Sequence, residues 1–228
     1  MPGRQRIPHP PDARPGDPPS WAALPAAHRR SLTLARVRAA MAKEDPAHEE
    51  WALPAELPGP PRPAAVLVPL FEEDDETRVV LTRRAAHLRS HTGEVSFPGG
   101  RLDPGEEAVA AALREAGEEV GIDPRAVEIL GQLAPLTTMS SAAAITPFVG
   151  VMARRPVLHP NPAEVELAFD VALADLVSDG VYHEERWSRP ERGEWPVHFF
   201  DLPEDIVWGA TARILHELLV LVVSQPPP

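Results

Sequence analysis

Short runs of apolar residues in the middle of the chain predict β-strands. Two of them, AAVLVPLF at 64–71 and TRVVLTRR at 77–84, are separated by the acidic stretch EEDDE, which predicts a hairpin. A third, GEVSFPGG at 93–100, is a short strand that ends at a proline and two glycines. We expect further strands at 127–135, 145–152, 164–170 and 196–201.

Apolar residues at helical spacing predict three helices. They cover Trp21 to Met41, 105–120 and about 205–223. Strands and helices therefore follow one another without the regular strand–helix–strand alternation of a doubly wound sheet. This order favours an α+β sandwich.

Proline dominates the first part of the chain. Residues 1–20 combine proline and charge so densely that they cannot build a core, and we expect them to be disordered. The segment LPAELPGPPRP at 53–63 predicts an extended connector. The sequence therefore predicts a proline-rich N-terminal extension with a short helix, 1–61, and a folded domain, 62–228.

Glutamates gather on one face of the helix predicted at 105–120. Glu115, Glu118 and Glu119 are spaced i, i+3 and i+4, so their side chains project from the same side. A different stripe carries the apolar side chains that can bury the helix against a sheet, namely Val109, Leu113, Ala116 and Val120. A strand and a glycine-rich loop, SFPGGRLDPGEE, precede the helix, and the backbone of such a loop can approach a ligand closely.

These neighbouring carboxylates raise one another's pKa unless a positive charge lies between them. Hard divalent cations that prefer oxygen ligands, Mg2+ or Mn2+, suit such a cluster. The alternative is an acidic helix surface that is simply solvated, since runs of charge usually face water. The glycine-rich loop in front of the helix favours the metal site.

The composition excludes several kinds of functional site. The 228 residues include no cysteine, so disulfides, thiolate metal sites and cysteine nucleophiles are excluded, and a metal must bind oxygen or imidazole. A formal net charge of -12 argues against a general nucleic-acid binder. The N-terminus lacks the apolar core of a signal peptide, and the stretch ILHELLVLVV is too short to span a bilayer. We therefore expect a soluble, cytoplasmic protein that binds neither nucleic acid nor membranes.

The order and spacing of eight residues resemble the signature of the Nudix hydrolase family. They are Gly100, Glu106, Arg114, Glu115, Glu118, Glu119, Gly121 and Ile122. The family usually has a larger aliphatic residue where this chain has Ala116, a difference that concerns packing rather than chemistry. The resemblance implies an α+β fold of the Nudix type, an α/β/α sandwich with a mixed sheet, preceded here by the proline-rich extension.

The resemblance also implies hydrolysis of a diphosphate, in which water attacks phosphorus and the helix holds Mg2+ or Mn2+. The implied metal ligands are the carbonyl of Gly99 and the carboxylates of Glu115, Glu118 and Glu119. Arg114 would orient the site by pairing with Glu106 or Glu115. The carboxylate that acts as the base varies within the family, and Glu164 or Glu166 is a further candidate near the metal.

A second stretch, 80–100, resembles the extra motif that precedes the signature in Nudix enzymes hydrolysing coenzyme A. The matching residues are Thr82, Arg84, Ala85, Arg89, Gly93, Phe97, Pro98, Gly99 and Gly100. The resemblance implies that the substrate is bound by Thr82, Arg84, Arg89 and Phe97. The loop TTMSSAAAITPF at 137–148 departs from that subfamily, because it lacks the expected glycine and bulky residue.

The same stretch concentrates positive charge in an acidic protein. The cationic side chains are Arg83, Arg84, His87, Arg89 and His91. Such a cluster suits a small-molecule ligand with several phosphates, because arginine can bind phosphate in a bidentate way. The alternative is an ordinary basic loop that balances the acidic EEDDE.

The function that we expect is a coenzyme A diphosphatase, which gives 3′-phosphoadenosine 5′-phosphate and 4′-phosphopantetheine and also accepts acyl or oxidised coenzyme A. One alternative is a Nudix diphosphatase for ADP-ribose or another nucleoside diphosphate derivative. A second is a module that senses a nucleotide without cleaving it, and a third is an interaction protein that works through its proline-rich arm. The sequence leaves open whether the chain forms a homodimer.

Overall fold

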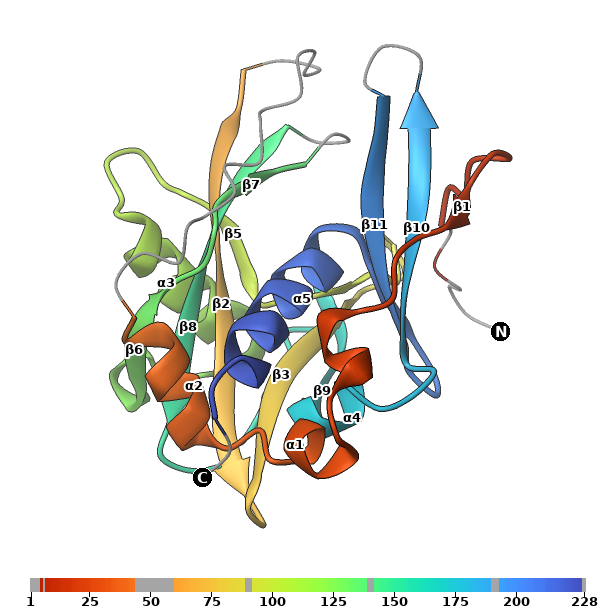
Figure 1. The fold of residues 1–228 in the computed structure, drawn as a ribbon. Coiled ribbons are helices and arrows are strands. Elements are labelled where there is room, and N and C mark those ends of the chain that lie inside the picture. The colour runs from red at the N-terminus through yellow and green to blue at the C-terminus, as the bar shows by residue number, and fades with distance from the viewer. Residues whose placement is uncertain are drawn as a thin grey trace.

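The computed structural model describes residues 5, 7–43, 60–88, 92–138, 142–189 and 193–226. The larger of its two sheets is eight-stranded (Figure 1). Its strands are β2 (Arg62–Glu73), β3 (Glu76–Arg84), β4 (Val95–Ser96), β5 (Gly99–Arg101), β6 (Val127–Gln132), β7 (Leu136–Thr137), β8 (Ala143–Met152) and β9 (Val165–Ala172). The order is β4–β3–β2–β8–β6, with β5 beside β2, β7 beside β8 and β9 beside β3. Because β2 is parallel to β8 and antiparallel to β3, the sheet is mixed, as predicted.

The predicted hairpin between β2 and β3 is confirmed. Its two strands pair in register from Leu70 opposite Val79 to Glu73 opposite Glu76. The two turn residues, Asp74 and Asp75, have φ angles of 52° and 63°. Positive φ at both central positions matches the twist of a tight β-hairpin, and aspartate adopts this backbone region more readily than most residues.

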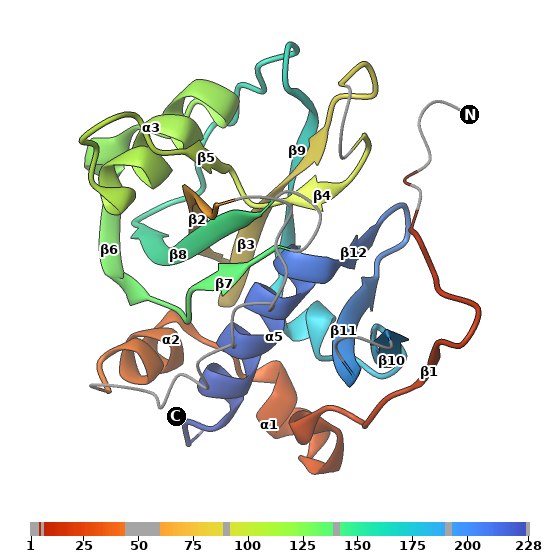
Figure 2. The same cartoon turned by 90° about the horizontal axis from the view of Figure 1, so that it is seen from above.

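Alternation along β2 divides the core into two clusters. Ala65, Leu67 and Phe71 are buried together with α3 (Ala108–Val120). Val68 and Leu70 are buried together with α5 (Gly209–Val223). Successive side chains of a strand point to opposite faces, so each face of the sheet is covered by a helix. Figure 2 shows α3 and α5 on opposite sides of the sheet, which confirms the predicted α/β/α layers.

A second, four-stranded sheet stands beside the first. It consists of β1 (Arg14–Pro15), β10 (Tyr182–Arg189), β11 (Gly193–Asp201) and β12 (Ile206–Trp208), paired antiparallel in the order β1–β10–β11–β12. The strand predicted at 196–201 is therefore confirmed as part of β11. The apolar pattern did not predict β10, because charged residues dominate that strand and only Tyr182 and Trp187 are buried.

The single helix predicted from Trp21 to Met41 is wrong. The chain instead forms η1 (Ser20–Ala23), α1 (Ala26–Arg30) and α2 (Leu34–Met41). Proline at position 25 cannot donate a hydrogen bond to the preceding turn, and this separates η1 from α1. Thr33 then starts α2, because its hydroxyl accepts a hydrogen bond from the backbone N–H of Arg36 at 3.4 Å.

The other two predicted helices are confirmed with later starts. α3 begins at Ala108, and residues 206–208 form β12 before α5 begins at Gly209. Two short helices, η2 (Pro124–Ala126) and α4 (Leu173–Leu176), lie in connections between strands. Within the described ranges, the structure contains no helix that is long and apolar enough to cross a membrane. The expected cytoplasmic location and the homodimer stay predictions.

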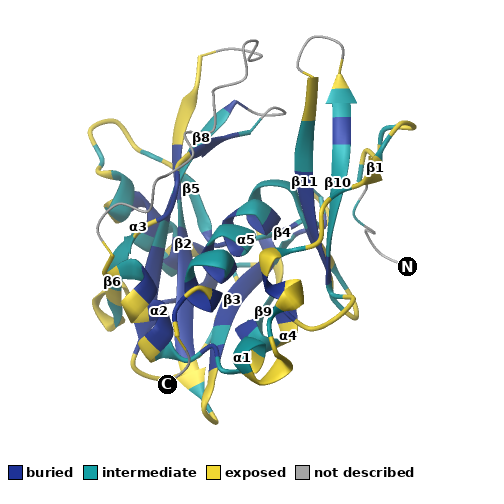
Figure 3. Cartoon of the chain, in the orientation of Figure 1, coloured by how far each residue is buried: buried dark blue, intermediate teal, exposed yellow. Residues whose placement is uncertain are grey.

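The N-terminal segment packs against the rest of the chain. Contrary to the predicted disorder, residues 7–19 run along the second sheet, where Gly16 N donates to Glu184 O at 2.7 Å. Trp21 and Val37 are 1% and 0% exposed and belong to the cluster that contains α5. In Figure 3, α2 and α5 both carry stretches coloured as buried. The domain boundary at residues 61 and 62 stays a prediction, and most of the predicted connector lies outside the described residues.

Candidate active site

Two adjacent glycines of β5 let the strand pass closely between β2 and α3. A Cβ on Gly99 would lie 2.4 Å from the backbone oxygen of Ala65. A Cβ on Gly100 would lie 2.5 Å from the carboxylate of Glu115. Neither position has room for a larger residue without displacing its neighbours. The glycines predicted as a ligand-binding loop therefore bring β5 directly against the acidic helix.

Glu119 is the most buried carboxylate of α3. It is 4% exposed, and its Oε2 accepts a hydrogen bond from Gly99 N at 3.1 Å. Burial raises the pKa of Glu119 to about 7, and the nearby negative charges of Glu115 and Glu164 act in the same direction. The hydrogen bond from Gly99 and the positive charge of Arg84 lower this pKa by less. The positive charge around Glu119 is thus too small to offset the effect of burial on its pKa.

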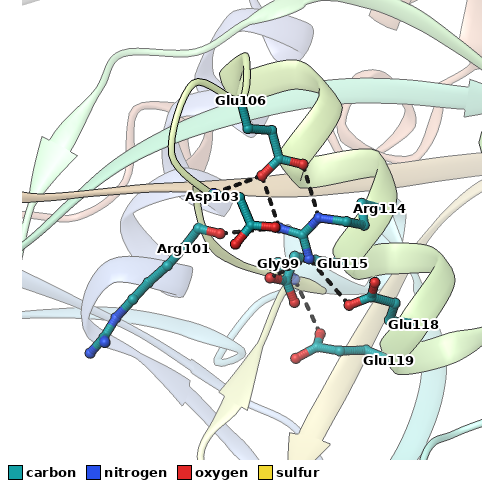
Figure 4. Close-up of polar contacts among 8 residues, drawn as sticks. All are labelled: Gly99, Arg101, Asp103, Glu106, Arg114, Glu115, Glu118 and Glu119. Carbon is teal, nitrogen blue, oxygen red and sulfur yellow. Dashed lines mark hydrogen bonds and ion pairs between the residues drawn. The ribbon is translucent and has the colours of Figure 1, made fainter.

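Arg114 connects the other carboxylates (Figure 4). Its Nε and Nη2 donate to the two oxygens of Glu106 at 2.9 and 3.0 Å. Its Nη1 donates to Glu115 at 2.9 Å and to Glu118 at 3.2 Å. The hydrogen bonds from Arg114 hold the pKa of Glu106 at about 2, well below its usual range. The sequence expectation was a pair with Glu106 or Glu115, and in the structure Arg114 contacts both.

The buried face of α3 differs from the predicted apolar stripe. Its fully buried residues are Ala111, Ala112, Ala116, Glu119 and Val120. Val109 and Leu113 are only partly buried. Glu119 therefore belongs to the packed side of the helix, whereas the side chain of Glu118 is 61% exposed. The three glutamates do not form one uniformly solvated surface, which argues against the alternative of a simple charged helix face.

The donor atoms at this site fit a hard divalent cation. Carboxylate and backbone carbonyl oxygens are the ligands that such cations prefer, and Glu119 is a buried carboxylate short of positive charge. Among the described residues, no three acidic or histidine side chains already stand in a chelating arrangement. Arg114 uses Oε1 of Glu115 and Oε2 of Glu118, so each carboxylate keeps a second oxygen outside that contact.

The residues predicted from the second motif to bind the substrate differ in their burial. Thr82 is 1% exposed, and its hydroxyl donates to Ser96 O at 3.1 Å, which ties β3 to β4. Phe97 is 3% exposed within the core cluster of α5. Both positions indicate support of the strands rather than contact with a ligand. Arg89 and His91 lie outside the described residues.

Arg84 is placed differently from these buried residues. Its Nε is buried and has no hydrogen-bond partner within the described part of the chain, and its charge lowers the pKa of Glu119. Arg83, the next residue back, is instead paired with Asp205 at 2.6 Å. Of the cationic residues that the structure describes in this stretch, Arg84 is thus the one whose charge acts on Glu119.

The connection from β8 to β9 brings one more carboxylate to the site. Asn161 N donates to Glu119 O at 2.8 Å and His159 N donates to Val120 O at 2.8 Å, so this loop binds the C-terminal end of α3. Three residues after Asn161, the carbonyl of Glu164 accepts from Ala85 N at 2.8 Å. Burial raises the pKa of Glu115, and the charge of Glu164 acts in the same direction. The sequence analysis did not assign Asn161 to the site, and its only signal there is the turn-forming dipeptide Asn-Pro.

Comparisons of the sequence with known proteins identify its relatives. A family model described as the NUDIX domain matches residues 60–166. The chain is 45% identical over 172 residues to "Uncharacterized Nudix hydrolase NudL" of Photorhabdus laumondii, which covers 72% of this chain and 90% of the relative. It is 39% identical over 180 residues to "Nudix hydrolase 22, chloroplastic" of Arabidopsis thaliana, with 73% of this chain and 57% of that relative covered.

Solved structures also resemble this fold. The crystal structure of a C. elegans Ap4A hydrolase binary complex is 21% identical, with a TM-score of 0.44, and the match covers 50% of this chain and 82% of that one.

Proposed function

The chain belongs to the Nudix hydrolase family and is a hydrolase of pyrophosphate bonds, and we propose that its substrate is coenzyme A. The products are 3′-phosphoadenosine 5′-phosphate and 4′-phosphopantetheine, and acyl and oxidised forms of coenzyme A are cleaved at the same bond. The observation that carries the proposal is Arg84, whose Nε has no hydrogen-bond partner in the described residues and whose positive charge acts on the buried Glu119. A cation at that point suits a substrate with several phosphates.

Nudix hydrolases generally use divalent metal ions, and we propose Mg2+ or Mn2+ for this chain. The residues that would hold the ion are Gly99, through its carbonyl, and Glu115, Glu118 and Glu119, through their carboxylates. A bound ion of this kind polarises the phosphate and makes a bound water more acidic. The raised pKa of Glu119 supports this assignment, because a nearby dication would offset the burial of its charge.

The side chains of the protein position the reacting groups. Arg114 holds Glu106 and Glu115 together, and Glu106 also accepts a hydrogen bond from Asp103 N at 2.9 Å, which fixes the loop before α3. Arg84 binds a phosphate oxygen of the substrate through its guanidinium. The proton of the attacking water passes to one of the carboxylates of the helix or to Glu164, whose charge acts on Glu115 and Glu119.

Turnover of a panel of diphosphates tests the substrate. Coenzyme A, acetyl coenzyme A, ADP-ribose and a dinucleotide are incubated with the full chain and Mg2+ or Mn2+, and the products are identified by mass. We expect coenzyme A to yield the two named products, with no product when the metal is removed by a chelator. Intact coenzyme A beside cleaved ADP-ribose would replace the substrate proposed here with the alternative. Binding of nucleotides without any turnover would support a sensing module.

A further inference from the structure

The two consecutive arginines at the end of β3 have different surroundings. Arg83 donates from Nε and Nη2 to the two carboxylate oxygens of Asp205 at 2.8 and 2.6 Å. The side chains of this pair are 19% and 11% exposed. Arg84, in contrast, has a buried Nε without a hydrogen-bond partner in the described residues. The protein therefore holds Arg83 through a two-point ion pair, while the Nε of Arg84 has no partner of this kind.

The Arg83–Asp205 pair joins the two sheets. Asp205 directly precedes β12 of the second sheet, and its carbonyl accepts a hydrogen bond from Leu202 N at 2.8 Å, which closes the turn between β11 and β12. Arg83 belongs to β3 of the larger sheet. A two-point contact between arginine and carboxylate fixes direction as well as distance. Asp205 therefore defines where the guanidinium of Arg83 lies.

Arg83 also lies at an irregularity in the pairing of β3 with β9. Arg83 pairs with Leu167 and Arg84 pairs with Val165, so Glu166 is an extra residue in β9. Such a bulge changes the direction of the side chains next to it. Arg83 Nη1 lies 3.7 Å from the Oε1 of this extra residue, Glu166. The guanidinium of Arg83 is thus placed between the second sheet and the bulge.

Arg84 and Ala85, the residues that follow Arg83 at the bulge, are held by two backbone hydrogen bonds. Arg84 N donates to Glu94 O at 3.0 Å, and Ala85 N donates to Glu164 O at 2.8 Å. These two hydrogen bonds hold the backbone of Arg84 and Ala85, and the charge of Arg84 acts on Glu119. Any shift of Arg83 that changed the bulge would alter them. The direction of Arg84 consequently depends on a contact made by its neighbour.

We propose that Asp205 is a positioning residue, which fixes the bulge at the end of β3 through Arg83 and so directs Arg84 at a phosphate of the substrate. The inference rests on the proposed function. It assigns a role in substrate binding to the second sheet, which carries none of the residues predicted for the site.

The test compares Asp205→Asn with a matched control. Asp170→Asn is the control, because Asp170 is also a buried partner of an arginine of β3, Arg78, but at the other end of the β3–β9 pair. Hydrogen bonds to charged groups are typically worth a factor of about ten or more in binding. We expect Asp205→Asn to raise the KM for coenzyme A about tenfold and to leave kcat within about a factor of three. Asp170→Asn should leave both constants unchanged.

A double variant shows whether Asp205 acts through Arg84. Arg84→Gln alone should raise KM by about tenfold or more, since it removes the contact with phosphate. If Asp205 only directs Arg84, then adding Asp205→Asn to Arg84→Gln raises KM no further. Two independent, additive increases would overturn the proposal, as would a KM for Asp205→Asn equal to that of the wild-type protein.

Hydrogen exchange tests the positioning without any substrate. Asp205→Asn should speed amide exchange at Arg84 and Ala85, whose N–H groups donate to Glu94 and Glu164. Asp170→Asn should leave exchange at these two amides unchanged. Unchanged exchange in Asp205→Asn contradicts the role of Asp205 even if the wild-type chain cleaves coenzyme A. Faster exchange in a protein that cleaves no diphosphate would instead place the failure with the proposed function.

Discussion

At the scale of single residues, Glu119 combines two properties that seldom occur together. Its spacing from Glu115 places it with the acidic residues of α3, yet it is 4% exposed. A buried carboxylate disfavours its own charge, and burial here raises the pKa of Glu119 to about 7. Such a position is costly for stability and is typical of functional sites.

Replacing Glu119 by glutamine tests its role as a metal ligand. Even the outer partners of metal ligands are worth about ten- to a hundredfold, so we expect Glu119→Gln to lose more than about a hundredfold in turnover and to bind Mn2+ more weakly. The fold should persist, because glutamine keeps the shape and removes a buried charge. Steady-state kinetics, Mn2+ titration and thermal melting measure these effects. Glu107→Gln, at an exposed position, is the control, and full activity in Glu119→Gln would contradict the assignment.

Gly100 provides a second test at the same scale. A methyl group there would meet the carboxylate of Glu115 at 2.5 Å and push it aside. A misplacement of about 1 Å can cost about a hundredfold in rate, so we expect Gly100→Ala to lose activity on this order.

Gly105→Ala is the matched control for Gly100→Ala. Gly105 has a φ of 81° with nothing near its missing Cβ. The substitution there should cost about 1–2 kcal/mol of stability and leave the rate unchanged. Equal rates for both variants would show that Glu115 has room to move.

At the scale of elements, α3 ends where the sequence predicts it. Gly121 has a φ of 75°, and its N–H donates to Gly117 O at 3.0 Å while Ile122 N donates to Ala116 O at 3.3 Å. This pattern is a common glycine-terminated helix end. The helix start was harder to place, because Glu107 at the N-cap makes no side-chain hydrogen bond.

Gly117 within α3 and Gly121 directly after it should respond to alanine in opposite directions. Gly121→Ala should destabilise the protein by about 1–2 kcal/mol, because alanine resists positive φ and its Cβ would lie 3.1 Å from His159. Gly117→Ala should stabilise it by about 0.5–1 kcal/mol, because glycine is a poor helix residue and the added Cβ stays 3.4 Å or more from its neighbours. Urea unfolding measures both. Similar shifts of the same sign would contradict this account of the helix.

At the scale of the whole molecule, the N-terminal segment has two parts with different roles. Residues 7–19 lie on the surface of the second sheet, whereas Trp21 is in the core. Further along, Arg36 is 3% exposed and donates to Val223 O at 3.1 Å and to Gln225 O at 2.7 Å. Arg36 therefore satisfies carbonyl groups at the C-terminal end of α5.

Truncation distinguishes these two parts. Deleting residues 1–20 should leave turnover of the substrate unchanged and lower the melting temperature. Deleting residues 1–43 should prevent folding, since it removes Trp21, Val37 and the guanidinium of Arg36 from the core. Circular dichroism and gel filtration report the fold of each variant. Loss of activity in the shorter deletion would show that the arm contributes to the site or to a contact between copies of the chain.

Two buried histidines connect the second sheet to α5. The rings of His198 and His216 stack with their centroids 4.3 Å apart, and the hydroxyl of Tyr182 is hydrogen-bonded to His198 Nδ1 at 2.7 Å. Burial lowers the pKa of His198 to about 3 and that of His216 to about 4, and the charge of Arg213 acts in the same direction. The carboxylate of Glu184 lies 3.8 Å from His198 and is paired with Arg186 at 2.9 Å.

The lowered pKa values of these two histidines predict that the folded protein loses stability in acid. The unfolded chain protonates them near their ordinary pKa of 6.5, whereas the folded chain does so only near 3 and 4, so stability falls as pH drops through this window. Each group contributes at most about 1.4 kcal/mol per pH unit. Unfolding measured from pH 7 to pH 4 should therefore show a shallower slope in His216→Phe than in wild type. His87→Gln, at an exposed position, should keep the wild-type slope.

Local patterns in the sequence were enough to predict much of the fold and part of the candidate site. The hairpin, α3 and α5 follow from apolar periodicity, and the grouping of Glu115 with Glu119 follows from helical spacing. The same patterns failed for β10, where charged residues hide the two buried positions, and for residues 21–41, where Pro25 and Thr33 divide one apolar pattern into separate helices. These failures occur where contacts between distant segments override local preference.

The sequence by itself determined the order of the elements, the acidic face of α3 and the glycines of β5, because these depend on residues close together along the chain. Only the tertiary structure decided that Glu119 is buried, that Arg83 is held by Asp205, and that the Nε of Arg84 has no partner in the described residues. Burial and ion pairing depend on which distant residues meet. Two neighbouring arginines of the same type can therefore have different roles.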